Sequence, residues 1–479
     1  MTENAGLTTR AASRRLASRL GTAMGRPQDI AALAAFRVAF GAIVTISALR
    51  FLAFGWIDQL FVMPRVHFKY WGFEWVPAPT PAVAWASFVL LAVLGLLVSL
   101  GLLYRFAVVS LFVVFTYLQL IDVATYLNHY YLVSLLALLL SFMPAHRAFS
   151  LDARLRPSLR ASTAPAWCLY LLRAQVALVY VNAGLAKATA DWLLHAQPLD
   201  IWLAARTSLP LIGPFLDRPA VAFAMSWAGF LFDTTIVLWL SWPRTRRAAY
   251  VAVLVFHAMT WLLFPAIGMF PVIMAVAALT FFDPSWPRGL LRRAREARPQ
   301  LRLLSSEGLG RRRRVGRWVA VAAGVVFLLL QVGLPLRTHL YGGNVSWHEQ
   351  GMRFSWRVMT REKNGSVTFM VREAASGREW LVPPSKYLTR VQEREMAVQP
   401  DLILQLARRI ARDFAVAGHP GVSVHADARV SLNGRPAAPF VDPEIDLARV
   451  EDGLGAKDWV LPAPEVSPPL LRSLAVVGP

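Results

Sequence analysis

The chain has 479 residues, of which 56% are hydrophobic, and a formal net charge of +21. Its mean hydropathy is +0.45, and several apolar stretches reach the roughly 20 residues that a helix needs to cross a bilayer, which excludes an ordinary soluble protein. A single cysteine, Cys168, excludes internal disulfides and cysteine-rich zinc sites.

Residues 1–30 form a polar, basic arm without the short apolar core and cleavage site of a signal peptide. We interpret this segment as a basic cytoplasmic arm. An organellar transit peptide would share its composition, which is rich in Arg and Ser and poor in acids.

Apolar segments then predict about nine transmembrane helices within a multi-pass domain over residues 31–338. The segments are 31–56, 81–104, 106–125, 129–143, 164–186, 219–242, 248–264, 267–282 and 318–336. The fold class that we expect is an α-helical polytopic membrane protein with a C-terminal extracytoplasmic α+β domain.

Arginine is concentrated in alternate loops. The loops 144–163 and 283–317 and the PRTRR segment are basic, whereas the loops between them hold only scattered cations. Because cytoplasmic loops carry the excess of Lys and Arg, this pattern predicts a cytoplasmic N-terminus. The positive charge is therefore interpreted as a topology signal in a cell-membrane protein rather than as a nucleic acid site. An odd number of helices places the residues after about 340 on the outer side.

Residues 339–479 are less hydrophobic and show strand-like alternation. VTFMV and REWLV predict a hairpin, and DLILQLARRIARDFAV predicts a helix with one apolar face. VSVHADARVSLNGRP predicts another strand that ends in an Asn-Gly turn. We expect these elements to form the extracytoplasmic α+β domain.

Ionisable residues in or near the apolar segments are candidates for function, because they are costly in a bilayer. Lys187, His129, His257 and Asp122 are expected on the outer side, whereas Asp233 is expected closer to the cytoplasmic end. No histidine spacing favours a metal site.

Four of these residues also have a structural interpretation. Lys187 could extend its amine into the interface, and His129 with Asn128 could cap a helix. His257 could form a hydrogen bond across helices, and Asp233 is expected to pair with a neighbouring polar group.

Four stretches together resemble the vitamin K-dependent γ-glutamyl carboxylases and the wider group of membrane proteins that share their transmembrane domain. They are LNHYYLVSLLALLLSFM, YVNAGLAKATADW, FHAMTWLLFPAIGMFP with DPSWPRGL, and RFSWRVM with NGRPAAPFVDPEIDL.

The resemblance implies γ-carboxylation of glutamate side chains, coupled to epoxidation of the quinone. Its cofactor would be reduced vitamin K or menaquinol, with O2 and CO2 as co-substrates and no metal. Lys187 would take a proton from the quinol, and oxidation of the quinol would supply the stronger base that removes the γ hydrogen. We expect burial to keep this lysine neutral. The partners would be membrane lipids, the quinone and a glutamate-containing peptide or protein, without nucleic acid.

The same resemblance implies roles for further residues. His129 with Asn128 would act in the carboxylation half of the reaction. The glutamate-bearing substrate would bind at His339, Phe354, Ser355 and Trp356. We assign His257, Asp233 and Tyr180 to binding of the cofactor.

Two features depart from the family. Animal members have two adjacent lysines where this chain has Ala186 and Lys187. The stretch after DPEIDL is short, which argues against a recognition surface for a propeptide. A quinol epoxidase or oxidase without carboxylation, and a non-catalytic membrane protein that binds lipid or a partner, remain alternatives.

Overall fold

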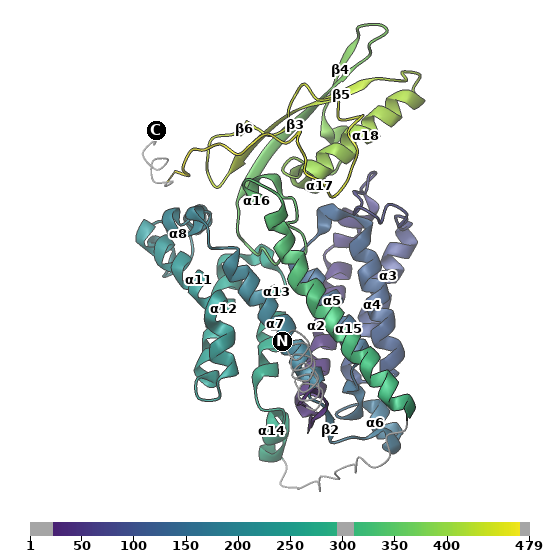
Figure 1. Cartoon of the computed structure of the whole chain (residues 1–479), viewed down its shortest axis with the longest axis vertical. Helices are drawn as coiled ribbons and strands as arrows, with labels where there is room; N and C mark the ends of the chain where they lie inside the picture. Colours follow the sequence, from purple (N-terminus) through teal and green to yellow (C-terminus); the bar gives the residue numbers. More distant parts are fainter. Residues whose placement is uncertain (1–22, 295–310, 470–479) are drawn as a thin grey trace, which may run out of the picture.

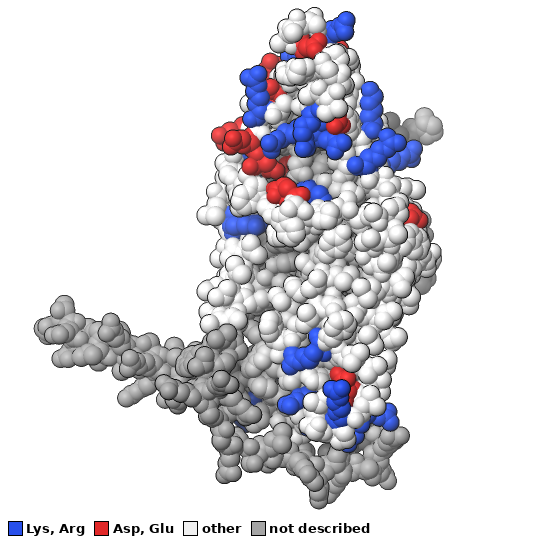
Figure 2. Space-filling view, turned by 90° about the vertical axis from the view of Figure 1, so that its right-hand side faces the viewer, with Lys and Arg blue, Asp and Glu red and all other residues white. Residues whose placement is uncertain are grey.

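The computed structural model describes residues 23–294 and 311–469. Long helices form the body of the molecule, and an α+β domain lies at one end of it (Figure 1). Figure 2 shows charged side chains toward both ends of one face, separated by a belt of uncharged surface. Such a belt is typical of a surface in contact with lipid. Most of the predicted basic arm and residues 295–310 of the predicted basic loop lie outside the described residues.

A helix forms at each of the nine predicted apolar segments. These helices are α2 (Ala31–Ala53), α3 (Pro81–Leu100), α4 (Tyr104–Ile121), α5 (Asn128–Phe142), α7 (Trp167–Leu185), α11 (Pro219–Ser241), α12 (Arg246–Leu263), α13 (Phe270–Ala278) and α15 (Arg311–Leu336).

Length and composition support fewer spans than the sequence predicted. Six helices of the described chain are long and apolar enough to cross a membrane: α2, α3, α4, α7, α11 and the segment Ala322–Leu340. In contrast, α5 has only 15 residues. The apolar segment Phe270–Phe281 is also short. Six of the nine predicted spans are therefore candidates by length and composition, and the prediction of nine is not confirmed.

The C-terminal α+β domain, called the outer domain after its predicted side of the membrane, contains the hairpin, helix and strand that the sequence predicted. Its sheet has the order β4-β3-β5-β6. The strands are β3 (Lys363–Arg372), β4 (Glu379–Val382), β5 (Ser423–Leu432) and β6 (Ala438–Pro439), each antiparallel to its neighbours. Helix α17 (Arg390–Met396) precedes α18 (Pro400–Val416), which buries Leu402, Leu406 and Ile410. Asn433 and Gly434, both with positive φ, make the turn after β5.

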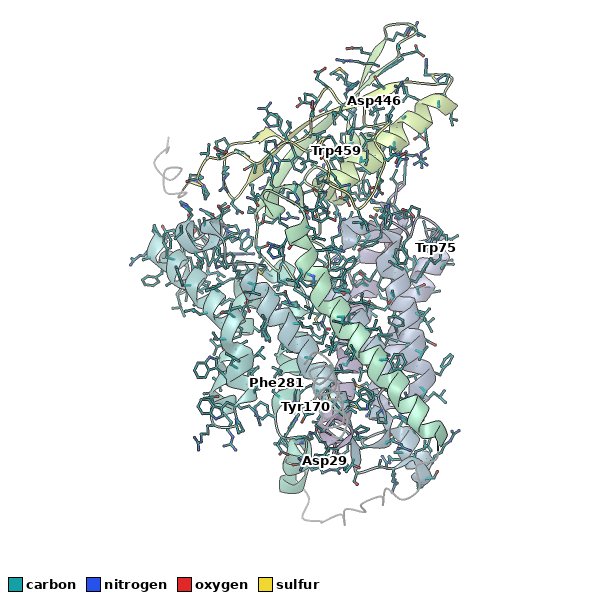
Figure 3. The ribbon with its side chains drawn as sticks, in the orientation of Figure 1. Asp29, Trp75, Tyr170, Phe281, Asp446 and Trp459 are labelled. Carbon is teal, nitrogen blue, oxygen red and sulfur yellow. The ribbon has the colours of Figure 1, made fainter. Side chains whose placement is uncertain are left out.

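The two ends of the molecule carry different connections. Helices α6 (Leu151–Leu155) and α14 (Trp286–Ala294) lie at the end opposite the outer domain (Figure 1). A short sheet of β1 (Pro27–Asp29) and β2 (Thr163–Pro165) lies there as well and was not predicted. Figure 3 shows Asp29 at this end, and Asp446 and Trp459 in the outer domain. The described parts of the predicted basic loops 144–163 and 283–317 therefore lie at the same end.

Specific polar contacts hold the outer domain on the helices. Both guanidinium Nη atoms of Arg435 lie 2.7 Å from carboxylate oxygens of Asp191, in α8 (Ala190–His195). Asn433 donates a further hydrogen bond to Asp191 over 2.7 Å. On the other side, Gln392 of α17 donates to Asp122, the acid at the end of α4, over 2.7 Å. These contacts fix the outer domain relative to the helices and so position any site between them.

Candidate active site

Close packing of two helices positions Lys187. The lysine follows the last turn of α7, where the sequence contains Ala183 and Gly184. A Cβ atom at Gly184 would lie 2.6 Å from Thr234 Cγ2 and 2.8 Å from the Thr234 nitrogen of α11. A larger residue would push the helices apart, because small residues allow backbones in a membrane to approach closely. The NAGLAK stretch thus brings α11, and Asp233 with it, against the lysine.

Lys187 is buried and bound to three acceptors. Its Nζ donates to Oδ2 of Asp233 over 2.8 Å, to the Ala183 carbonyl over 3.1 Å and to the Val358 carbonyl over 3.4 Å. Only 5% of the residue is exposed, so the interpretation as a lysine that extends into the interface is wrong. The burial is as expected, and the amine in addition contacts a carboxylate of a neighbouring helix.

Asp233 lies next to Lys187 and not near the cytoplasmic end as expected. The reason is an offset between the helices. Trp192 lies in α8, which follows Lys187, and it forms two hydrogen bonds with Ser226 of α11. The Trp192 indole N–H donates to the Ser226 carbonyl over 2.9 Å, and the Ser226 hydroxyl donates to the Trp192 carbonyl over 2.5 Å. The first turns of α11 therefore lie beyond the end of α7, and Asp233 reaches the depth of Lys187. The expectation that Asp233 pairs with a polar neighbour is confirmed.

Lys187 and Asp233 line an apolar cavity of about 110 Å³. Side chains of α7, α11, α12 and α13 form most of the wall, and they include Val179, Phe256, Leu263, Phe270 and Met274. Tyr180 and His257 add a polar pair to this wall, since the Tyr180 hydroxyl lies 2.8 Å from Nε2 of His257. This contact joins α7 to α12 and confirms the cross-helix hydrogen bond of His257. Nδ1 of the same ring has no partner among the described residues.

A loop of the outer domain completes the cavity. Val358 and Met359 belong to the wall, although they follow the last transmembrane segment and precede β3. Phe354, Trp356 and Met359 have φ values of 64°, 59° and 52°, a region that non-glycine residues rarely adopt. Such conformations persist only where surrounding contacts hold them. Residues 351–360, the insertion loop, are therefore fixed against the helices.

Aromatic contacts hold the insertion loop. Trp356 is 0% exposed and stacks on Tyr131 of α5 with ring centroids 4.9 Å apart. Phe354 contacts the same Tyr131 ring edge-on at 4.8 Å, and its backbone N–H donates to the Tyr126 hydroxyl over 2.8 Å. Ser355 is buried, and its hydroxyl donates to the Met352 carbonyl. Three of the four residues predicted to bind substrate thus lie where the two domains meet.

Comparison with known protein families covers both parts of the chain. Residues 25–286 match the HTTM domain, and residues 317–466 match the lumenal domain of vitamin K-dependent γ-carboxylase. The chain belongs to the vitamin K-dependent γ-glutamyl carboxylase family. No solved structure matches the chain. The cavity between these two matched regions is consequently the candidate active site of a carboxylase-like enzyme, which implies a vitamin K hydroquinone cofactor and a glutamate-containing substrate.

The lining of the cavity has the chemistry that would suit a lipid-soluble quinol. Aromatic and aliphatic side chains form its wall, as expected for a ring with an apolar tail. Lys187, Tyr180 and His257 are the polar groups that could contact the ring hydroxyls, and Nδ1 of His257 is still unpaired among described groups. These residues would bind the quinol.

His129 lies close to the cavity without lining it. Its ring is 6.2 Å from that of Phe270, and the His257 ring is 6.4 Å from the same phenylalanine. Phe270 therefore lies beside both histidines. His257 lines the cavity, whereas His129 lies outside the cavity wall. The helix-cap interpretation is wrong, because α5 has no side-chain cap. Asn128 instead accepts a hydrogen bond from the Tyr126 hydroxyl over 3.0 Å.

His339 differs from the other predicted substrate residues. It is exposed in the turn Arg337–Leu340, whereas Phe354 is partly buried and Ser355 and Trp356 are buried, and none of the four lines the cavity. The structure thus separates it from Phe354, Ser355 and Trp356. Within residues 23–294 and 311–469, no group of three or more His, Cys, Asp or Glu residues could hold a metal ion.

Sequence reasoning missed two components of the site. Val358 and Met359 were not predicted, although FSWRVM is unusually apolar for a segment of the polar outer domain. That composition could have indicated burial against the helices. The aromatic residues of α12 and α13 were missed as well, because they are typical of any lipid-facing helix.

Proposed function

We propose that the chain carboxylates glutamate side chains on peptides or proteins with reduced vitamin K or menaquinol, O2 and CO2, and forms the quinone epoxide and water. The observation that supports this proposal is the buried amine of Lys187, which lies in an apolar cavity 2.8 Å from Oδ2 of Asp233. A loop of the outer domain forms part of the wall of this cavity.

The pair of Lys187 and Asp233 provides a place for a proton. In a cavity of low polarity, the proton between them can reside on Nζ or on Oδ2, since burial disfavours a charged pair and proximity favours it. With the proton on Asp233, the amine is neutral and accepts the phenolic proton of the quinol. The ammonium that results is stabilised by the Ala183 and Val358 carbonyl oxygens. When bound, the reduced quinone together with O2 would supply the base that is strong enough to remove a γ hydrogen of glutamate.

The remaining residues orient and enclose the reactants. Tyr180 and His257 would contact the quinol ring, and the apolar wall would exclude water from the base. Phe354, Ser355 and Trp356 would bind the glutamate segment. His129, with Asn128, would stabilise the carbanion or orient CO2 from behind Phe270.

This chemistry also suggests a topology. A lipid-soluble quinol reaches the cavity from the bilayer, whereas the peptide arrives from the side of the outer domain. We propose a cell-membrane protein of about nine spans with a cytoplasmic basic arm at 1–30, a membrane domain at 31–338 and an extracytoplasmic domain at 339–479.

Purified protein with reduced quinone, labelled bicarbonate and a short glutamate peptide tests the proposal. We expect incorporation of label together with epoxide, and we expect Lys187→Ala to abolish both without loss of membrane insertion. Lys386→Ala, which removes an exposed lysine of the outer domain, is the matched control. Epoxide without label would support the quinol epoxidase. Epoxide from Lys187→Ala would refute the assignment of the base, and no reaction by the wild-type protein would favour a non-catalytic binding protein.

A further inference from the structure

One cation of the insertion loop lacks an acceptor. The other Lys and Arg residues from the end of α15 to the start of β3 are paired: Arg337 with the Arg353 carbonyl, Arg353 with Asp401, and Arg361 and Lys363 with Glu349. Arg357 makes no hydrogen bond or ion pair with any residue that the structure describes. No charged neighbour raises or lowers the pKa of its guanidinium. Arg357 is nonetheless partly buried.

Its two neighbours fix the position of Arg357 beside the active site. Trp356 is packed among the helices, and Val358 accepts a hydrogen bond from Lys187 and lines the cavity. Consecutive Cα atoms are about 3.8 Å apart, so the Arg357 backbone lies next to the groups that contact the lysine. Burial, with a smaller contribution from the charge of Arg357, lowers the pKa of His348 in α16 (Val345–His348). The Arg357 side chain does not line the cavity itself, and the loop that carries it connects the cavity to the outer domain, the side from which a peptide would arrive.

Burial without a partner is unfavourable for this group. Desolvation lowers the pKa of Arg357 below its ordinary value, and no acid offsets that effect. An arginine keeps its proton even so, which leaves a partly desolvated cation. A carboxylate from outside the chain would provide the missing partner, and a planar guanidinium binds a carboxylate through two parallel hydrogen bonds.

We propose that Arg357 binds the side-chain carboxylate of the glutamate that is carboxylated, an inference that rests on the proposed function. In that reaction the γ C–H bond breaks, the proton passes to the base formed by quinol oxidation, and the electron pair remains on the γ carbon. The carbon lies next to a carboxylate, so a second negative charge develops beside the first. A guanidinium on that carboxylate stabilises the pair of charges, and the carbanion then bonds to CO2.

Variants of Arg357 test this role. We expect Arg357→Gln to raise the KM for a glutamate peptide by about 10- to 100-fold, as for loss of a charge-assisted bidentate contact. Arg357→Lys, which keeps the charge but loses the planar fork, should show a smaller rise. Arg429→Gln, which removes an exposed arginine of β5, is the matched control.

Direct binding gives a readout that a merely structural role would not change. The wild-type protein should bind a labelled glutamate peptide more tightly than its glutamine analogue, and Arg357→Gln should bind both alike. The inference would be overturned if Arg357→Gln preferred the glutamate peptide over the glutamine analogue as strongly as the wild-type protein does. An unchanged KM of Arg357→Gln for the glutamate peptide would also overturn it. A wild-type protein that incorporates no CO2 would instead contradict the proposed function. If Arg357→Gln does not fold, the KM of Arg357→Lys decides, and an unchanged value overturns the inference.

Discussion

Nζ of Lys187 lies 2.8 Å from Oδ2 of Asp233, and each side chain is only 6% exposed. Removal of one partner from a buried ion pair leaves an uncompensated charge and typically costs about 3–5 kcal/mol. We therefore predict that Asp233→Ala lowers the free energy of unfolding in detergent by that order and abolishes epoxidation.

A double-mutant cycle isolates the pair. If the two residues act as one proton site, Lys187→Ala combined with Asp233→Ala should be more stable than the sum of the single changes predicts, because no charge remains buried. Additive losses of stability would show that the contact is not coupled in solution.

The second prediction concerns the substitution His129→Ala. His129 lies behind Phe270 and outside the cavity wall, so His129→Ala should reduce CO2 incorporation about tenfold more than epoxidation. Parallel assays of labelled CO2 and epoxide on one preparation measure the ratio. Equal loss of both activities would place His129 in the quinol half of the reaction.

Asp191 should make the docking of the outer domain dependent on pH. Burial alone would raise the pKa of Asp191, but hydrogen bonds from Arg435 and Asn433 lower it below the ordinary 3.8. A lowered folded-state pKa means that this stabilisation is complete above the ordinary value and is lost as the pH falls through the folded value. Thermal unfolding between pH 7 and pH 3 should therefore show a smaller acid loss for Asp191→Asn than for the wild-type protein. The same loss of thermal stability with falling pH in Asp191→Asn and the wild-type protein would contradict the prediction.

Topology is the last prediction and depends on labelling. Cys168 is buried, so Cys168→Ser should provide a silent background. We expect Ser376→Cys, in the exposed β3–β4 turn, to react with an impermeant maleimide in intact cells. Ser158→Cys, in the predicted cytoplasmic loop 144–163, should react only after lysis. The reverse pattern would invert the proposed orientation.

Local patterns in the sequence determined much of the fold. Apolar runs located the helices, and alternation with an Asn-Gly turn located β5, because burial repeats along a single element and needs no knowledge of its neighbours. The motif around Lys187 likewise indicated the family. The number of spans was harder to predict from the sequence, because α5 is apolar but has only 15 residues, fewer than a membrane-spanning helix needs.

The partners of the candidate base required the tertiary structure. Asp233 lies 46 positions from Lys187, and Val358 lies 171 positions away. Hydropathy shows that a segment enters the membrane, but it does not show how far one helix is offset along another. Close packing at Gly184 and the pairing of Trp192 with Ser226 set that offset, and aromatic packing on Tyr131 brings the insertion loop between the helices. Contacts of this kind depend on side-chain shape across distant segments, so only the folded chain decides them.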